Sequence, residues 1–253
     1  MISATLMGGL GNYLFQIGAA ATLAHKNNDE ACFDYSLQIQ VHKDIHSYSS
    51  NILRNVRNVP VVCTHVYTEP GDFAFNEIPY VPNLRLHGYF QTEKHLDRDY
   101  ILELFSIDGA TDDYITAKYS HLLELPELVS VHVRRGDYIE KQDRHPVQGL
   151  DYYQRAFEQF PNAKFAIFSD GMDWCKEHFI GDRFAFIENE FDFIDLYLMS
   201  KCHHNIIANS SFSWWGAYLN TYQNKKVIAP SVWFGNTKKL ITDNIYCNSW
   251  IVL

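Results

Sequence analysis

Short apolar runs alternate with amphipathic stretches most clearly in the second half of the chain. The apolar runs predict strands at residues 128–133, 164–168, 184–187, 205–208 and 227–230. Helical spacing between them predicts helices at residues 151–160, with Asp151 as the N-cap, and at 174–178, 193–201 and 211–219. Because the connections are short, this order is typical of a parallel sheet flanked by helices.

The first half carries a weaker pattern. Residues 2–7 predict a buried strand, Gly8 to Asn12 a tight turn, and the residues from Leu14 onward a helix. Further strands are expected within residues 59–66 and 84–89, and a helix over residues 108–125 that ends against Pro126. We therefore expect two α/β domains, residues 1–126 and 127–253, joined by a compact hinge.

Polar residues follow three of the predicted strands, those ending at Val133, Phe168 and Ala208. Ligands of parallel sheets bind at the carboxyl ends of the strands. We therefore expect these three polar segments to meet in one crevice.

The segment from His132 to Asp137, His-Val-Arg-Arg-Gly-Asp, gives the most specific functional prediction of the three. Strand alternation places His132 and Arg134 on one face and Arg135 on the other. Two adjacent guanidinium groups repel each other unless an anion lies nearby, and a pyrophosphate matches their hydrogen-bonding geometry. The alternative is an ion pair of Arg134 or Arg135 with Asp137 or another carboxylate.

The segment Asn209 to Ala217 follows a predicted strand and opens a helix. Ser210, Ser211 and the unpaired backbone N–H groups of the first helical turn form a potential anion site. Simple N-capping by a serine is the alternative. For Trp214 and Trp215 we favour packing in the core.

Composition narrows the choice of function. The formal net charge of −9 argues against a partner that needs a basic surface, such as a nucleic acid or an anionic membrane. Residues 2–24 and 202–224 lack charged side chains, but both are interrupted by polar residues, so we expect neither to span a membrane and the protein to be cytoplasmic. The five cysteines have no framework spacing and are expected to be reduced. No metal-binding motif is present, and Asp97-Arg98-Asp99 lies in a charged run typical of a solvated helix.

Several motifs in order resemble those of the α-1,2-fucosyltransferases, glycosyltransferase family eleven. They are Gly8 to Gln16, Gly88 to Gln91, His132 to Tyr138, Asp151 to Tyr153, Phe168 to Asp170 with Trp174, and Asp195 to Ser200 followed by Asn209 to Ala217. The resemblance spans nearly the whole chain. It implies a GT-B-like fold with two Rossmann-like domains facing a cleft, the first on the acceptor side and the second binding the GDP-sugar.

The resemblance also implies a reaction, the inverting transfer of L-fucose from GDP-β-L-fucose to the 2-hydroxyl of a galactose-terminated oligosaccharide, without a required metal or other cofactor. It implies that Arg134 and Arg135 hold the pyrophosphate and that Arg135 offsets the charge developing on GDP. His132 would support the nucleotide and Asp195 would accept hydrogen bonds from guanine. Ser210, Ser211 and the Phe212 backbone would meet the phosphates, and Gly11 and Asn12 would approach from the opposite domain.

Two departures from the family pattern stand out: Tyr13 follows Asn12, and Gly171 follows Asp170. The second leaves Asp170 open to a plain turn or helix-cap role. Inversion calls for a base beside the acceptor hydroxyl. Asp137 is the first choice and could instead hold an arginine; Glu140, Asp143 and His145 are the alternatives.

Two other functions compete with fucosyl transfer. A transferase with another donor, such as GDP-mannose or a UDP-sugar, would share most of these motifs. A non-catalytic nucleotide- or glycan-binding module would share the fold, but the intact arginine pair and serine-rich loop disfavour it. A P-loop is absent, and the single Gly9-x-Gly11 lacks the third glycine of a dinucleotide site.

Overall fold

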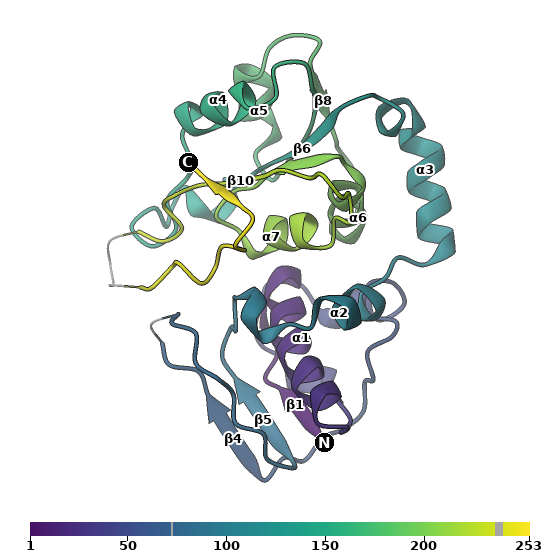
Figure 1. Ribbon diagram of the computed structural model, residues 1–253, viewed down its shortest axis with the longest axis vertical. Coiled ribbons are helices and arrows are strands. Elements are labelled where there is room, and N and C mark those ends of the chain that lie inside the picture. The colour runs from purple at the N-terminus through teal and green to yellow at the C-terminus, as the bar shows by residue number, and fades with distance from the viewer. Residues whose placement is uncertain (72, 236–239) are drawn as a thin grey trace. The chain divides into compact units, whose positions relative to one another are not determined.

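Helices and parallel strands alternate along the chain in the computed structural model, which describes residues 1–71, 73–235 and 240–253 (Figure 1). Internal contacts divide it into two units. The first comprises residues 1–108 and 240–247, and the second residues 109–239 and 248–253. The division falls ahead of the boundary expected at residue 126. The intervening helix α3, Gly109–Leu123, packs against helix α6, Asp192–Lys201, and so belongs with the second unit.

The second unit contains a six-stranded sheet in the order β11-β10-β9-β6-β7-β8, and every pair in it is parallel. The strands are β6 Leu128–Val133, β7 Lys164–Ser169, β8 Phe184–Phe186, β9 His204–Ile206, β10 Val227–Ala229 and β11 Ile251–Val252. The expected parallel sheet is therefore confirmed, and the five predicted strands form at the expected places with ends shifted by at most two residues.

Alternation along β6 sends its side chains to two different helical layers. Val129, Val131 and Val133 join the core beneath α4, Leu150–Glu158, and α5, Met172–His178. Ser130 and His132 lie on the other face, where Ser130 accepts a hydrogen bond from Asn205 and His132 meets Phe212 of α7, Ser211–Tyr218. Figure 1 shows α4 and α5 on one side of this sheet and α6 and α7 on the other.

One helix start in this unit differs from the prediction. Helix α4 has Gly149 as its N-cap, and Asp151 lies in the first turn instead of capping it. A carboxylate in the first turn still stabilises the helix through its dipole. The prediction of Asp151 as the N-cap is therefore wrong.

The first unit has a three-stranded parallel sheet, β1-β5-β4, formed by β1 Ile2–Ala4, β5 Leu84–His87 and β4 His65–Thr68. A second, two-stranded sheet pairs β2, Met7–Gly8, with β3, Ile39–Val41. Helices α1 Leu10–Lys26 and α2 Arg98–Leu104 accompany short 3-10 turns at Tyr35–Leu37, Ile45–Tyr48 and Glu93–His95; a further one, Gly136–Tyr138, lies in the second unit.

Three expectations for the first unit need correction. The strand expected over residues 2–7 is broken into β1 and β2. Gly11 and Asn12 lie in the first turn of α1 instead of a loop, because the turn is completed at Gly8, whose φ is +92°. Within residues 59–66 only the last two are in a strand.

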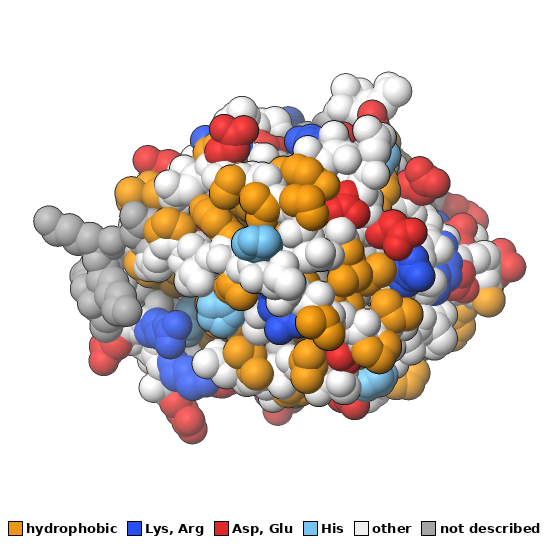
Figure 2. Space-filling view, turned by 90° about the horizontal axis from the view of Figure 1, so that it is seen from below, with side chains coloured by type: hydrophobic (Ala, Val, Ile, Leu, Met, Phe, Trp, Pro, Cys, Tyr) orange, Lys and Arg blue, Asp and Glu red, His pale blue; other side chains and the backbone are white. Residues whose placement is uncertain are grey.

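Figure 2 shows one face of the surface. On this face hydrophobic side chains form several groups between acidic and basic ones, and the described residues make no large basic area there. None of the described helices is long and apolar enough to cross a membrane. The five cysteines, all in the described part, form no disulfide, and only Cys63 is not buried.

Candidate functional site

Three of the polar segments meet at the carboxyl ends of β9, β6 and β7, which are adjacent in the sheet. Arg134 follows β6 directly, Asp170 follows β7, and α7 begins at Ser211 shortly after β9. The expected convergence is confirmed within the second unit.

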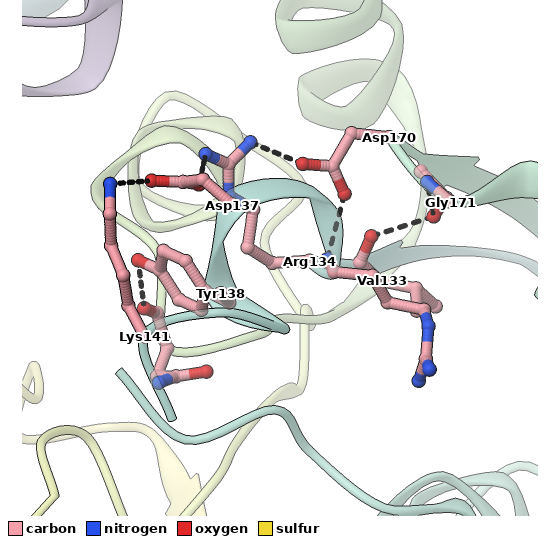
Figure 3. Close-up of polar contacts among 10 residues, drawn as sticks. Val133, Arg134, Asp137, Tyr138, Lys141, Asp170 and Gly171 are labelled. Atoms are coloured by element: carbon pink, nitrogen blue, oxygen red, sulfur yellow. Dashed lines mark hydrogen bonds and ion pairs between the residues drawn. The ribbon is translucent and has the colours of Figure 1, made fainter. Parts of the chain in front are cut away.

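Arg134 is enclosed by carboxylates. Its Nη2 lies 2.5 Å from Oδ1 of Asp137, and its Nη1 lies 2.5 Å from Oδ2 of Asp170. Figure 3 shows the guanidinium between these two carboxylates. The guanidinium carbon is also 5.0 Å from the ring centre of Tyr138. Arg134 thus has the ion-paired environment that was the alternative to phosphate binding.

Asp137 is engaged through both of its oxygens. Oδ1 accepts from Arg134, and Oδ2 accepts from Lys141 at 2.8 Å (Figure 3). Although partial burial opposes ionisation, the Lys141 hydrogen bond and the Arg134 charge together lower the pKa of Asp137 below its usual value. A carboxylate with a lowered pKa is a weak proton acceptor.

Arg135 has different surroundings. Its backbone N–H donates to Oδ1 of Asp170 at 2.7 Å, and its guanidinium carbon lies 4.3 Å from the ring centre of Trp174. No carboxylate of the described residues pairs with this guanidinium. Asp170 therefore contacts both arginines, and these contacts differ from the turn or helix-cap role that the sequence also allows.

His132 is buried beside the arginines. Burial lowers the pKa of its imidazole to about 4, so the ring is neutral at pH 7. Its ring lies 5.4 Å from that of Phe212, and Nδ1 has no hydrogen-bond partner among the described residues. A buried nitrogen without a partner is unusual in a native protein, so His132 Nδ1 needs a partner that the described residues do not supply.

The start of α7 presents backbone N–H groups that have no intrahelical partner by position. Ser210 is the N-cap residue, but its side chain makes no capping hydrogen bond. The preceding Asn209 is buried and fixed, because its amide donates to the carbonyls of Pro146 and Trp233 and accepts from Gln148. The turn before α7 is therefore rigid, while the Ser210 hydroxyl is left out of the helix cap.

Asp195 lies on α6, and its pKa is shifted in the opposite direction from that of Asp137. Burial, with added repulsion from Glu190 and Asp192, raises the pKa of Asp195 to about 7. Its Oδ1 is buried and has no hydrogen-bond partner among the described residues. Leaving a buried carboxylate oxygen unpaired costs free energy, so a ligand that donates to it would be favoured.

Glu190, just before α6, anchors the neighbouring helix α3. Its carboxylate accepts from the hydroxyls of Tyr114 and Tyr119, the latter at 2.7 Å, and pairs with Lys118. Lys201 and Asp112 form a second ion pair between the two helices. These contacts hold α6, and Asp195 with it, against α3.

Gly11 and Asn12 belong to the first unit. The Asn12 side chain accepts a hydrogen bond from Gln91 at 2.9 Å, which links the motif at the start of the chain to the motif Gly88 to Gln91. A Cβ at Gly8 would lie 2.4 Å from the Asn12 amide, so glycine is needed there. The approach of Gly11 and Asn12 to the donor stays a prediction.

The alternative bases have ordinary loop environments. Glu140 and Asp143 are exposed. His145 stacks on Tyr138 with ring centres 4.8 Å apart, and partial burial lowers the pKa of its imidazole. The described residues contain no group of three or more His, Cys, Asp or Glu side chains placed to hold a metal ion.

Comparison with known proteins assigns this site to a family. The family model for glycosyl transferase family 11 matches residues 65–253. The chain belongs to glycosyl transferase family 11. This confirms the family expected from the motifs.

Two Escherichia coli proteins are similar to this member of family 11. The O-antigen biosynthesis glycosyltransferase WbnK is 38% identical over 66% of this chain and 60% of its own length. An alpha-1,2-colitosyltransferase is 27% identical over 92% of both chains. The rabbit galactoside alpha-(1,2)-fucosyltransferase 2 is 28% identical over 84% of this chain and 65% of its own.

Solved structures show the fold of this family member. The alpha-1,6-fucosyltransferase NodZ, in a crystal soaked with GDP-fucose, matches 86% of this chain and 92% of its own with a TM-score of 0.58 and 13% identity. POFUT1 in complex with GDP-fucose matches 88% and 94% with a TM-score of 0.51 and 12% identity. The GT-B-like α/β fold is confirmed.

The structure brings most of the predicted site residues together. His132, Arg134, Arg135, Asp137 and Phe212 lie around the carboxyl end of β6, with Ser210 and Ser211 at the start of α7. Sequence reasoning missed the roles of Lys141, Trp174 and Glu190. Trp174 is part of a quoted family motif but has no role assigned from the sequence, and Lys141 carries a local signal, the i to i+4 spacing from Asp137.

Proposed function

We propose that this family 11 glycosyltransferase moves L-fucose from GDP-β-L-fucose to the 2-hydroxyl of a galactose-containing glycan, with inversion at the anomeric carbon. The named activities of its relatives support the linkage. The observation that carries the proposal is Arg135, a cation without a carboxylate partner among the described residues, at the end of the strand where family motifs meet.

In the proposed reaction the bond between the fucose anomeric carbon and the β-phosphate oxygen breaks as the acceptor oxygen attacks from the opposite face. Arg135 and the first N–H groups of α7 stabilise the negative charge that gathers on the departing GDP. The Ser210 and Ser211 hydroxyls add donors to the phosphates. Neutral His132 supports this region by packing against Phe212 and offers Nδ1 to the nucleotide.

Guanine recognition is assigned to Asp195. Its unpaired Oδ1 and its second oxygen suit the paired donors on guanine N1 and N2. Binding guanine would supply the partners that this buried carboxylate lacks. A uracil base has no such pair of donors, so a UDP-sugar should bind poorly.

The acceptor proton must leave as the new bond forms. Asp137 is the first candidate for the base that takes this proton. The contacts of Asp137 with Arg134 and Lys141 favour the alternative role, in which Asp137 holds Arg134 in place. With a loose transition state, stabilisation of the leaving group dominates and a strong base is not needed. The base assignment stays a prediction.

A second candidate differs only in the donor sugar. The relative that matches 92% of both chains is named an alpha-1,2-colitosyltransferase. A donor screen by mass spectrometry decides between the candidates, with GDP-fucose, GDP-colitose, GDP-mannose and UDP-sugars offered with lactose. We expect GDP-fucose to be used best, and preference for another donor would overturn the sugar assignment.

A second arm of the same screen tests metal independence. We expect turnover of GDP-fucose to be unchanged after treatment with EDTA. A strict requirement for added Mg²⁺ or Mn²⁺ would contradict the expectation that no metal takes part.

A further inference from the structure

Trp174 lies directly against the cation that the proposed function needs. Its indole ring centre is 4.3 Å from the Arg135 guanidinium carbon. At this distance the face of an indole attracts a guanidinium electrostatically. Unlike a carboxylate, the ring does so without neutralising the charge or occupying all of the N–H donors.

The indole ring is held in place by the core of the second unit. Its ring centre is 6.4 Å from that of buried Tyr153 and 5.6 Å from that of buried Phe179. It stacks on His178 at 4.4 Å with an interplanar angle of 21°, and His178 Nδ1 lies 2.8 Å from the Trp174 carbonyl oxygen. Neighbours on several sides therefore restrict how the ring can move.

The stem of Arg135 reaches Trp174 by crossing Gly171. A Cβ at Gly171 would lie only 3.0 Å from both Cβ and Cδ of Arg135. Any side chain at this position would crowd the stem of Arg135. The glycine thus permits the contact between Arg135 and Trp174.

Both oxygens of Asp170, the carboxylate that contacts the Arg135 backbone, already accept hydrogen bonds. Asp170 directs Oδ1 to the Arg135 backbone N–H and Oδ2 to the Arg134 guanidinium. This arrangement fixes the backbone of Arg135 and leaves its side chain to the indole ring. Asp170 therefore holds the backbone of Arg135 and Trp174 holds its guanidinium, and the guanidinium charge is not neutralised by a carboxylate of the described residues.

We propose that Trp174 is a positioning residue for Arg135, holding the guanidinium ready for the donor pyrophosphate. The inference rests on the proposed function of Arg135. It predicts that Trp174 affects the phosphates of the ligand and not its base, and that its effect requires Arg135.

A double-mutant cycle tests this prediction. Affinities for GDP and for guanosine are measured by calorimetry for wild type, Trp174→Leu, Arg135→Ala and the double variant. We expect Trp174→Leu to weaken GDP binding about fivefold, in the range of a partly exposed cation–π contact, and to leave guanosine binding unchanged. In the Arg135→Ala background the same substitution should have no further effect.

Two further variants separate positioning from simple loss of stability. Phe160→Leu disturbs the same core without a described contact to Trp174 or Arg135, and should lower Tm without changing the ratio of GDP to guanosine affinity. Trp174→Phe keeps an aromatic face and should retain most of the GDP affinity.

The outcomes distinguish the two proposals. Equal losses for GDP and guanosine, or an undiminished effect of Trp174→Leu when Arg135 is absent, would overturn the role of Trp174 alone. Unchanged GDP affinity in Arg135→Ala would instead overturn the pyrophosphate assignment on which it rests.

Discussion

On one face of the chain after β6, Arg134 lies between two aspartates, whereas on the other face Arg135 lies against an indole ring. The same contrast appears in the carboxylates. Both oxygens of Asp137 have cationic partners, while a buried oxygen of Asp195 has none among the described residues. Paired groups maintain the shape of a site, and unpaired ones, which include the buried Nε of Arg134 as well as Oδ1 of Asp195, are where a ligand gains most.

The largest effect should come from Arg135→Ala. Because the guanidinium is available to the leaving group, kcat/KM for GDP-fucose should fall by about 10²–10³-fold. Tm should change little, since the side chain is only half-buried and forms no ion pair with the described residues. Steady-state kinetics and thermal unfolding measure the two quantities.

Arg155→Ala is the matched control, because Arg155 is an exposed arginine on α4 of the same unit. It should leave both quantities unchanged. Arg134→Ala sharpens the contrast, since it leaves Asp137 and Asp170 without their shared cation and should lower Tm as well as activity. Equal loss of Tm in both site variants would erase the distinction between the arginines.

Asp195→Asn should have the next largest effect, a loss of affinity for the nucleotide. Loss of a charged acceptor should weaken GDP binding at pH 8 roughly 10- to 100-fold and remove the preference for GDP over IDP, which lacks the 2-amino group. Calorimetry with both nucleotides measures this. Retained discrimination between GDP and IDP would place guanine elsewhere.

The same variant should be more stable than wild type above neutral pH. The pKa of Asp195 is raised to about 7, so the folded protein holds this proton more tightly than the unfolded chain does. Stability is therefore lost as pH rises from about 4 to 7, and removing the carboxylate should restore it at pH 8 and not near pH 4. Thermal unfolding at both pH values provides the check.

Asp137→Asn should cause a smaller loss, because Asn retains an oxygen for Arg134 and the Asp137 carboxylate is a weak base. We expect kcat to fall less than about tenfold, below the 10²–10⁴-fold contribution of a general base. Single-turnover kinetics with saturating acceptor measure the chemical step. A loss of about 10³-fold with donor affinity unchanged would restore Asp137 as the base.

The sequence predicted the elements of the second unit and the convergence of their ends, because periodicity and strand alternation are local properties. Alternation along β6 correctly separated Arg134 from Arg135. The prediction was weaker in the first unit, where a break after three residues divides the first strand and the glycine-rich turn is shorter than expected.

The partners of the site residues could not be predicted in the same way. Asp170 reaches Arg134 across 36 positions of the chain, and Glu190 reaches Tyr119 across 71. No local spacing distinguishes such a carboxylate from one that caps a turn. The raised pKa of Asp195 likewise follows chiefly from its burial, which only the folded structure shows, while Glu190 and Asp192 are close to it in the chain.

The last prediction concerns the pH dependence of donor binding. Asp195 must be ionised to accept from guanine, so affinity for GDP-fucose should fall as pH drops below about 7. The diphosphate diester of GDP-fucose does not titrate in this range, unlike the terminal phosphate of GDP. Binding without acceptor from pH 5.5 to 8.5, about 1.5 units on either side of the midpoint, therefore reports on Asp195, and Asp195→Asn should give a flat profile.

Substitutions of Glu190 and of its partner Lys118 should shift the pH midpoint of donor binding in opposite directions. Glu190→Gln removes a negative charge that raises the pKa of Asp195, so the midpoint should move down by about half a pH unit. Lys118→Met also breaks the ion pair between Lys118 and Glu190. It leaves the negative charge of Glu190 uncompensated, so the midpoint should move up. Movement in the same direction for both variants would show that the contact with α3, and not the charge of Glu190, governs Asp195.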